Sequence, residues 1–178
     1  MEDAITLAEA LPLRASIKNT IADLQSERNQ VATVIYEKGD DYELPSRNFE
    51  QVTEEIEQVA QDLRMLENKI ALANLQNTVD WSDEKLSIHE AIMLAQYLRQ
   101  EANELLMYSK KKKVSVHRDS YGINLSKSSI QEKTLYDPDT VRNESVKLTR
   151  KANKLSSMID AANHSITINF DADRYMGY

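Results

Sequence analysis

The chain of 178 residues contains no cysteine and only three glycines and three prolines. Without cysteine it can form neither disulfide bonds nor a thiolate site for a metal or a nucleophile. Few glycines and prolines mean few tight turns, which argues against sandwiches and barrels and favours long helices. The composition therefore predicts a mainly helical protein.

Long apolar runs are also missing. No stretch approaches the roughly 20 apolar residues that a helix needs to cross a bilayer. The first ten residues, MEDAITLAEA, lack the basic-then-apolar order of a signal peptide. We therefore expect a cytoplasmic protein (in the host cytoplasm, if the source is viral) with no membrane partner.

Motifs for catalysis and for metals are absent as well. The sequence has no Gly-x-Ser-x-Gly elbow, no P-loop and no dinucleotide fingerprint. A di-iron bundle would need Glu-x-x-His pairs, and none occurs. His89, His117 and His164 lie far apart in the chain. These absences predict no enzyme activity, no cofactor and no metal site.

Heptad stripes are the clearest pattern that is present. In one stretch apolar residues alternate steps of three and four over more than three heptads, which is typical of a coiled-coil helix. These residues are Phe49, Val52, Ile56, Val59, Leu63, Leu66, Ile70 and Ala73. Similar stripes elsewhere predict a fold of four long helices in coiled-coil-like bundle packing.

Capping signals mark where the helices begin. Thr6 with Glu9, and Ser87 with Glu90, each match a capping box, and Pro138 suits a first helical position. We predict one helical domain over 1–178, with helices at 6–37, 46–77, 87–110 and 138–163.

Two stretches alternate apolar and polar residues instead, which is the period of a strand. VSVHR and INLS flank a DSYG turn and predict a β-hairpin over 112–128. ITINF predicts a C-terminal strand over 165–171, followed by a tail at 172–178 that is either flexible or docked on a neighbouring subunit.

Three segments together resemble a small bacterial helical family known as septicolysin or as a domain of unknown function. They are LAEALPLRASIKNTIADL, SIHEAIMLAQYLRQEANEL and LSSMIDAANHSITINF, and the resemblance covers nearly the whole chain. It implies a helical, oligomeric protein. The four consecutive lysines and the longer tail depart from the family's usual pattern.

The lysine run is the main candidate site. The formal net charge is −7, yet residues 110–133 hold seven basic residues against two acidic ones. Such a spot suits a small anion, whereas the acidic remainder repels a long nucleic acid. The predicted ligand-binding residues are Arg14, Lys111, Lys112, Lys113, His117, Arg118 and Tyr121.

Each of these residues also has a purely structural interpretation. Lysines at a helix C-terminus are stabilised by the helix dipole. Arg14 lies on an apolar stripe, where its guanidinium either pairs with a glutamate or waits for an anionic ligand. Arg118 suits the recognition of a phosphate, and Tyr121 offers a ring on which a base can stack.

The leading hypothesis is a non-enzymatic homo-oligomer, a dimer or tetramer, that captures a small anionic ligand such as a nucleotide or cyclic nucleotide. Viral sponges that sequester immune signals are proteins of this class. The alternative is a structural or protein-interaction helical protein without a small-molecule ligand. An enzyme acting on nucleotides is the third hypothesis, which the missing motifs disfavour.

Overall fold

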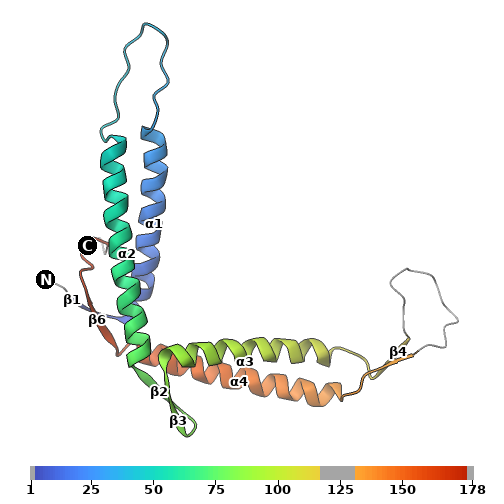
Figure 1. Cartoon of the computed structure of the whole chain (residues 1–178). Helices are drawn as coiled ribbons and strands as arrows, with labels where there is room; N and C mark the ends of the chain where they lie inside the picture. Colours follow the sequence, from blue (N-terminus) through green and yellow to red (C-terminus); the bar gives the residue numbers. More distant parts are fainter. Residues whose placement is uncertain (1–2, 117–130, 176–178) are drawn as a thin grey trace. The chain divides into compact units, whose positions relative to one another are not determined.

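The structure, a computed structural model, describes residues 3–116 and 131–175. This part of the chain is mainly helical, with four helices and three small antiparallel strand pairs (Figure 1). The helices are α1 (Leu7–Val31), α2 (Phe49–Gln76), α3 (Ile88–Ser109) and α4 (Pro138–Asn163). The strands are β1 (Asp3–Thr6), β2 (Thr78–Trp81), β3 (Glu84–Ser87), β4 (Val114–Val116), β5 (Gln131–Lys133) and β6 (Thr167–Phe170). The predicted fold class is confirmed.

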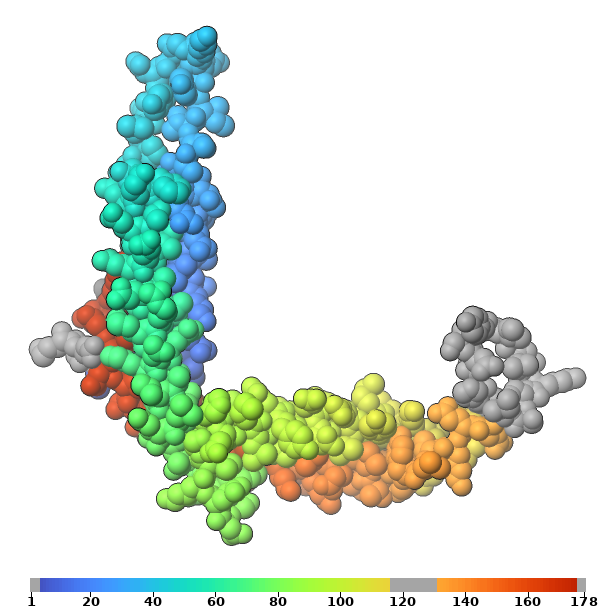
Figure 2. All heavy atoms as spheres, viewed as in Figure 1, coloured from blue at the N-terminus to red at the C-terminus, as the bar shows by residue number. Residues whose placement is uncertain are grey.

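The contacts of the chain divide it into two compact units. One contains Met1–Val79 together with Asp160–Tyr178, and the other contains Asp80–Ile159. In the first unit α1 packs along α2. In the second α3 lies beside α4, and the two helices share a hydrogen bond (Figure 2).

Side-chain caps fix the start of each helix. Thr6, Asn48 and Ser87 each accept a hydrogen bond from the backbone three residues later and complete a capping box. Asp137 accepts hydrogen bonds from the backbone and the hydroxyl of Thr140 at the start of α4. Two of the three boxes are those predicted; Asn48 with Gln51 was not predicted.

The core of the first unit lies along the α1–α2 contact. The heptad stripe of α2 is largely confirmed, because Val52, Val59, Leu66, Ile70 and Ala73 are buried. The stripe that spacing predicts for α1 is only partly confirmed; it comprises Ala10, Arg14, Ile17, Ile21, Leu24, Arg28, Val31 and Ile35. The buried residues of α1 include Leu13, the neighbour of the predicted Arg14, and they are Leu7, Ala10, Leu13, Ile17 and Leu24.

Strands β1 and β6 close one side of this core. They pair antiparallel, with Ile5 opposite Ile168 and Asp3 opposite Phe170. The N–H of Leu7 continues the pairing with a 2.9 Å hydrogen bond to the carbonyl of Ile166. The predicted C-terminal strand is confirmed, whereas its partner β1 was not predicted.

The first five residues after β6 extend this unit. Ala172 is buried in the core, and Tyr175 packs against it. Arg174 lies within 3.4 Å of Glu55 and 3.5 Å of Asp62, both on α2. This part of the predicted tail is therefore docked on its own chain.

The second unit is a helical pair with short strands at its ends. Its buried side chains include Ala91, Ala95 and Ala102 of α3 and Ala152 and Leu155 of α4. The buried hydroxyl of Ser145 on α4 donates a 2.7 Å hydrogen bond to the carbonyl of Ala102 on α3. Small residues at these positions permit a close approach of the two helices.

Two predicted boundaries are wrong. The first helix ends at Val31, six residues before the predicted 37. The predicted hairpin pairs VSVHR with INLS, but Val114–Val116 pairs with Gln131–Lys133 instead. The predicted DSYG turn lies outside the described residues.

No helix in the described part of the chain is long and apolar enough to cross a membrane.

Candidate functional site

The lysine run begins where α3 ends. The helix finishes at Ser109, and Lys110 is its C-cap. The N–H of Lys111 donates a 3.1 Å hydrogen bond to the carbonyl of Tyr108. Ammonium groups at this end are stabilised by the helix dipole, as the structural interpretation of the lysines predicts.

Contacts between aromatic rings and backbone groups hold the segment in place. The hydroxyl of Tyr136 donates a 3.0 Å hydrogen bond to the carbonyl of Tyr108, and the two rings meet edge to face with their centroids 5.8 Å apart. The N–H of Thr134 donates to the carbonyl of Lys113 at 3.1 Å. The backbone that carries the lysines, just before β4, is therefore held by hydrogen bonds to the segment between β5 and α4.

The β4–β5 ladder has two faces. Val114 lies opposite Lys133, and Ser115 lies opposite Glu132. Because side chains alternate along a strand, the Val114–Lys133 pair faces one way and the Ser115–Glu132 pair the other. We call these the valine face and the serine face.

A hollow of about 290 Å³ adjoins the serine face, lined by Lys111, Lys112, Ser115, Glu132 and Thr134. It brings together two of the predicted lysines with two hydroxyls and one carboxylate. The ammonium of Lys111 lies 3.8 Å from the carboxylate of Glu132, so part of its charge is balanced. Lys112 forms no ion pair with any residue in 3–116 or 131–175.

Lys113 has a structural role. Its ammonium donates to the carboxylate of Asp137 at 2.9 Å. This contact raises the pKa of Lys113. Together with hydrogen bonds from Thr140, it lowers the pKa of Asp137 to about 2. Lys113 therefore links the lysine run to the N-cap of α4.

Three predicted site residues, His117, Arg118 and Tyr121, lie outside the described residues. Ser115, Glu132 and Thr134 line the hollow and were not predicted. Nothing in the sequence pairs Ser115 with Glu132, because the register joins residues across a long connection and not across the predicted tight turn. The stretch QEKT is polar throughout and has no apolar–polar alternation, so the sequence gives no signal for this strand.

Arg14 belongs to the other unit and is half-buried on α1. The nearby carboxylate of Glu67 is 2.8 Å from the ammonium of Lys18. The pKa of Glu67 is lowered chiefly by that hydrogen bond and, to a smaller extent, by the charge of Arg14. Arg14 thus lies close enough to a carboxylate on α2 to interact with its charge. This favours the interpretation in which Arg14 pairs with a glutamate over the one in which it binds an anionic ligand.

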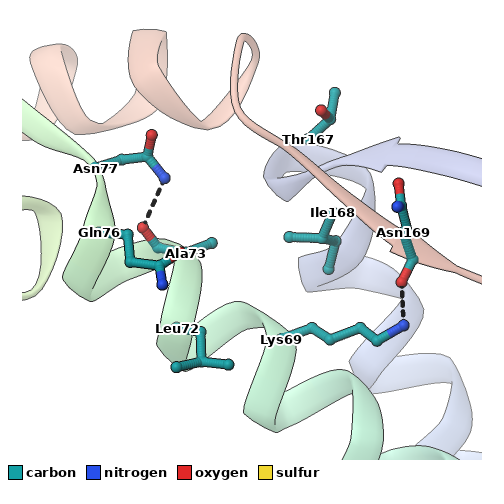
Figure 3. Close-up of a pocket in the computed structure, with 8 residues that line it drawn as sticks. All are labelled: Lys69, Leu72, Ala73, Gln76, Asn77, Thr167, Ile168 and Asn169. Carbon is teal, nitrogen blue, oxygen red and sulfur yellow. Dashed lines mark hydrogen bonds between the residues drawn. The ribbon is translucent and has the colours of Figure 1, made fainter.

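A second hollow, of about 320 Å³, lies in the first unit between the end of α2 and β6 (Figure 3). The ammonium of Lys69 donates to the backbone carbonyl of Asn169, and the amide of Asn77 donates to the carbonyl of Ala73 (Figure 3). The contact of Lys69 joins β6 to α2, whereas that of Asn77 caps the C-terminal end of α2. The hollow contains none of the predicted site residues.

Among the described residues, no group of three or more histidines, aspartates and glutamates is placed to hold a metal ion.

Comparisons with known proteins support the fold. No protein-family model and no curated protein matches the chain. A solved structure, described as that of a functionally unknown conserved protein from Corynebacterium diphtheriae, is similar with a TM-score of 0.66 and 19% sequence identity. The match covers 94% of this chain and 100% of that one. At this identity the likeness shows a shared fold, and the function has to be argued from the site itself.

Proposed function

We propose that this protein is a non-enzymatic, oligomeric binding protein that captures a small anionic ligand at the serine face. The observation that supports this most is the hollow in which Lys111 and Lys112 stand beside the hydroxyls of Ser115 and Thr134. Lysines supply point charges for a phosphate, and the hydroxyl of Ser115 supplies a directed hydrogen bond. The hydroxyl of Thr134 already donates a 3.2 Å hydrogen bond to the carbonyl of Tyr136.

The composition of the hollow favours a nucleotide over a bare inorganic anion. Glu132 only accepts hydrogen bonds when ionised, so it suits a ligand that also carries donors, such as a sugar hydroxyl or an exocyclic amine. A nucleotide has both a phosphate and such donors. The volume of about 290 Å³ fits one mononucleotide unit better than a long strand.

Among the three lysines, we expect Lys112 to contribute most to the affinity for the ligand. Lys113 is occupied by Asp137, and Lys111 is partly balanced by Glu132. An ion pair that already exists must be weakened before the lysine can serve a ligand. Lys112, which has no such partner among the described residues, carries no such cost.

Isothermal titration calorimetry with mono-, di- and cyclic nucleotides tests the proposal. We expect binding by the wild-type protein and a loss of about tenfold in affinity in Lys112→Ala, the effect of removing one hydrogen bond between charged groups. Lys133→Ala is the matched control, because it removes the same charge from the valine face. If no nucleotide of the panel binds at about 100 μM, the proposal is excluded, because the free energy of binding would then be weaker than about −5.5 kcal/mol.

As part of this proposal, the protein acts as a viral sponge that sequesters a nucleotide signal. A sponge binds its ligand without converting it. Recovery of the unchanged nucleotide after denaturation of the complex, by chromatography, distinguishes a sponge from an enzyme.

A further inference from the structure

The loop between α1 and α2, residues 32–48, exposes an unusual number of apolar side chains. Ile35 is fully exposed, Leu44 is 77% exposed, and Val34, Tyr36 and Tyr42 are exposed as well. In Figure 1 the loop extends beyond the adjacent ends of both helices. Long connections without secondary structure are usually either functional loops or linkers. Clustered exposed apolar groups usually mark an interaction surface, which favours the functional alternative here.

Specific contacts shape this loop. The rings of Tyr36 and Tyr42 lie with centroids 4.8 Å apart. Between them Gly39 adopts a φ of 105°, and the N–H of Asp40 donates to the carbonyl of Glu37 at 3.0 Å. The two arms of the loop are thus joined through their aromatic rings and a tight turn.

The loop is also acidic. Glu37, Asp40, Asp41 and Glu43 stand against Lys38 within the turn region. Arg47, at the end of the loop, pairs instead with Glu27 and Glu55 on the helices. A partner for this surface must therefore offer apolar contact flanked by positive charge.

The valine face of the β4–β5 ladder has that character. A hollow of about 560 Å³ there is lined by Lys113, Val114, Lys133, Thr134, Leu135, Tyr136 and Asp137. Leu135 is 96% exposed, and Val114 is also exposed. Lys133 lies directly opposite Val114, so a cation adjoins the apolar surface.

We propose that the acidic loop of one copy of this chain docks on the valine face of a second copy. Ile35 and Leu44 of the loop cover Val114 and Leu135, and the carboxylates of Asp40 and Asp41 approach Lys133. The complementarity of charge and of apolar surface selects a second copy as the occupant. The inference rests on the proposed function in one respect, since it names the contact through which the proposed oligomer forms. That contact uses the face of the ladder opposite to the hollow proposed for the ligand.

The contact joins unlike surfaces. If each of two copies inserts its loop into the other, a closed dimer results, whereas one-way docking continues into a ring or chain. In both cases the mass in solution exceeds that of one chain, 20.4 kDa, and rises with protein concentration.

Sedimentation velocity over a range of concentrations provides the test. We expect Leu44→Asp, and separately Asp40→Lys with Asp41→Lys, to raise the dissociation constant of self-association about tenfold or more, or about 1.4 kcal/mol. Leu75→Asp and Asp83→Lys are matched controls, since both positions are exposed and lie outside the loop and the valine face. Circular dichroism checks that all variants remain helical.

A charge-swap experiment makes the test specific for the pair of surfaces. Lys133→Glu should weaken self-association, and mixing it with the Asp40→Lys, Asp41→Lys protein should restore a mixed assembly through reversed charges. A wild-type protein that stays monomeric at about 100 μM would overturn the inference, since any affinity would then be weaker than about −5.5 kcal/mol. So would loop variants that associate like the wild type, or a mixture that does not recover.

The ligand assay separates this inference from the proposed function. Lys133→Glu should retain nucleotide binding, because Lys133 does not line the serine-face hollow. Loss of self-association with retained binding supports the docking contact alone. If neither the wild type nor any variant binds a nucleotide, but the loop variants still weaken self-association, the proposed ligand is excluded and the docking contact is retained.

Discussion

The hydroxyl of Tyr175 donates a 2.6 Å hydrogen bond to the carboxylate of Asp62, a residue 113 positions earlier in the chain. Arg174 reaches the same carboxylate at 3.5 Å and also pairs with Glu55. Arg47 links Glu55 to Glu27 on α1. A chain of charged contacts thus fastens the residues after β6 to both helices of the first unit.

Tyr175→Phe removes the hydroxyl and keeps the ring in place. Asp62 retains Arg174, so it is not left unpaired, and we expect a loss of about 1 kcal/mol in the free energy of unfolding. Urea denaturation measures it. Asp62→Ala removes both contacts and should cost more; an equal or smaller cost would show that the hydroxyl contact carries the effect alone.

The same contact predicts a dependence on alkaline pH. Burial, and then the hydrogen bond to Asp62, raise the pKa of Tyr175 above its ordinary value of 10.0. A group whose pKa is raised on folding stabilises the fold below its unfolded pKa, and the contribution is lost as pH rises. The stability difference between wild type and Tyr175→Phe should therefore shrink above about pH 10. A difference that grows there would contradict the assignment.

The caps and stripes explain why much of the fold could be predicted. Capping boxes at Thr6 and Ser87, and Pro138 after Asp137, each involve residues within four positions, so the sequence shows them directly. The heptad stripe of α2 likewise depends on local spacing. The structure confirms these local features, and also the alternating ITINF strand, whose period is likewise local.

The end of α1 could not be predicted from spacing alone. The apolar stripe continues to Ile35, yet the helix stops at Val31. The guanidinium of Arg28 lies 5.8 Å from the ring of Phe49, the first residue of α2. Beyond this point α2 offers no further turn to pack on, and the β-branched run of Thr33, Val34 and Ile35 disfavours a helix without such support.

The ladder of the candidate site was missed for a different reason. The tight DSYG turn suggested local pairing, whereas Val114–Val116 pairs with residues 131–133. A register between distant strands is set by the contacts of the whole unit, such as those of Tyr136 and Thr134. The lysines of the site were visible in the sequence, but Ser115 and Glu132 were not.

Ser145 is the one polar side chain among the buried residues of the described chain. Its hydroxyl joins α4 to α3 through the carbonyl of Ala102. We expect Ser145→Ala to lower the free energy of unfolding by about 1 kcal/mol, because a buried hydrogen bond is lost. Ser157→Ala, whose exposed hydroxyl bonds only within its own helix, is the control and should be close to neutral. A neutral Ser145→Ala would show that the helical pair does not depend on this bond.

From the contact between Lys113 and Asp137 we predict that the stability of the fold decreases at acidic pH. The pKa of Asp137 falls from 3.8 to about 2, mainly through Lys113. A carboxylate with a depressed pKa stabilises the fold above its unfolded pKa, and the contribution disappears as pH falls toward the folded value. Asp137→Asn keeps a capping side chain but removes the charge. Its melting temperature should lie below that of the wild type at pH 7, and the gap should close between about pH 4 and pH 2.

Asp139→Asn serves as the control for this measurement. Asp139 is also acidic and exposed in the first turn of α4. Its variant should show a smaller gap at pH 7. If both variants behave alike, the effect belongs to the helix dipole and not to the Lys113 contact.

Arg118 and Tyr121 are two of the ligand-binding residues predicted from the sequence; they lie in the chain between Ser115 and Glu132, outside the described residues. Arg118→Ala should weaken nucleotide binding more than any single lysine change, because a planar guanidinium loses two directed hydrogen bonds where a lysine loses one point charge. Tyr121→Ala should cost about 1–3 kcal/mol if a base stacks on its ring. Calorimetry at several salt concentrations measures both, and affinity should fall as salt screens the charges. Tight binding that is indifferent to Arg118→Ala and to Lys112→Ala would move the site away from the lysine run, and Arg14 is the next residue to replace.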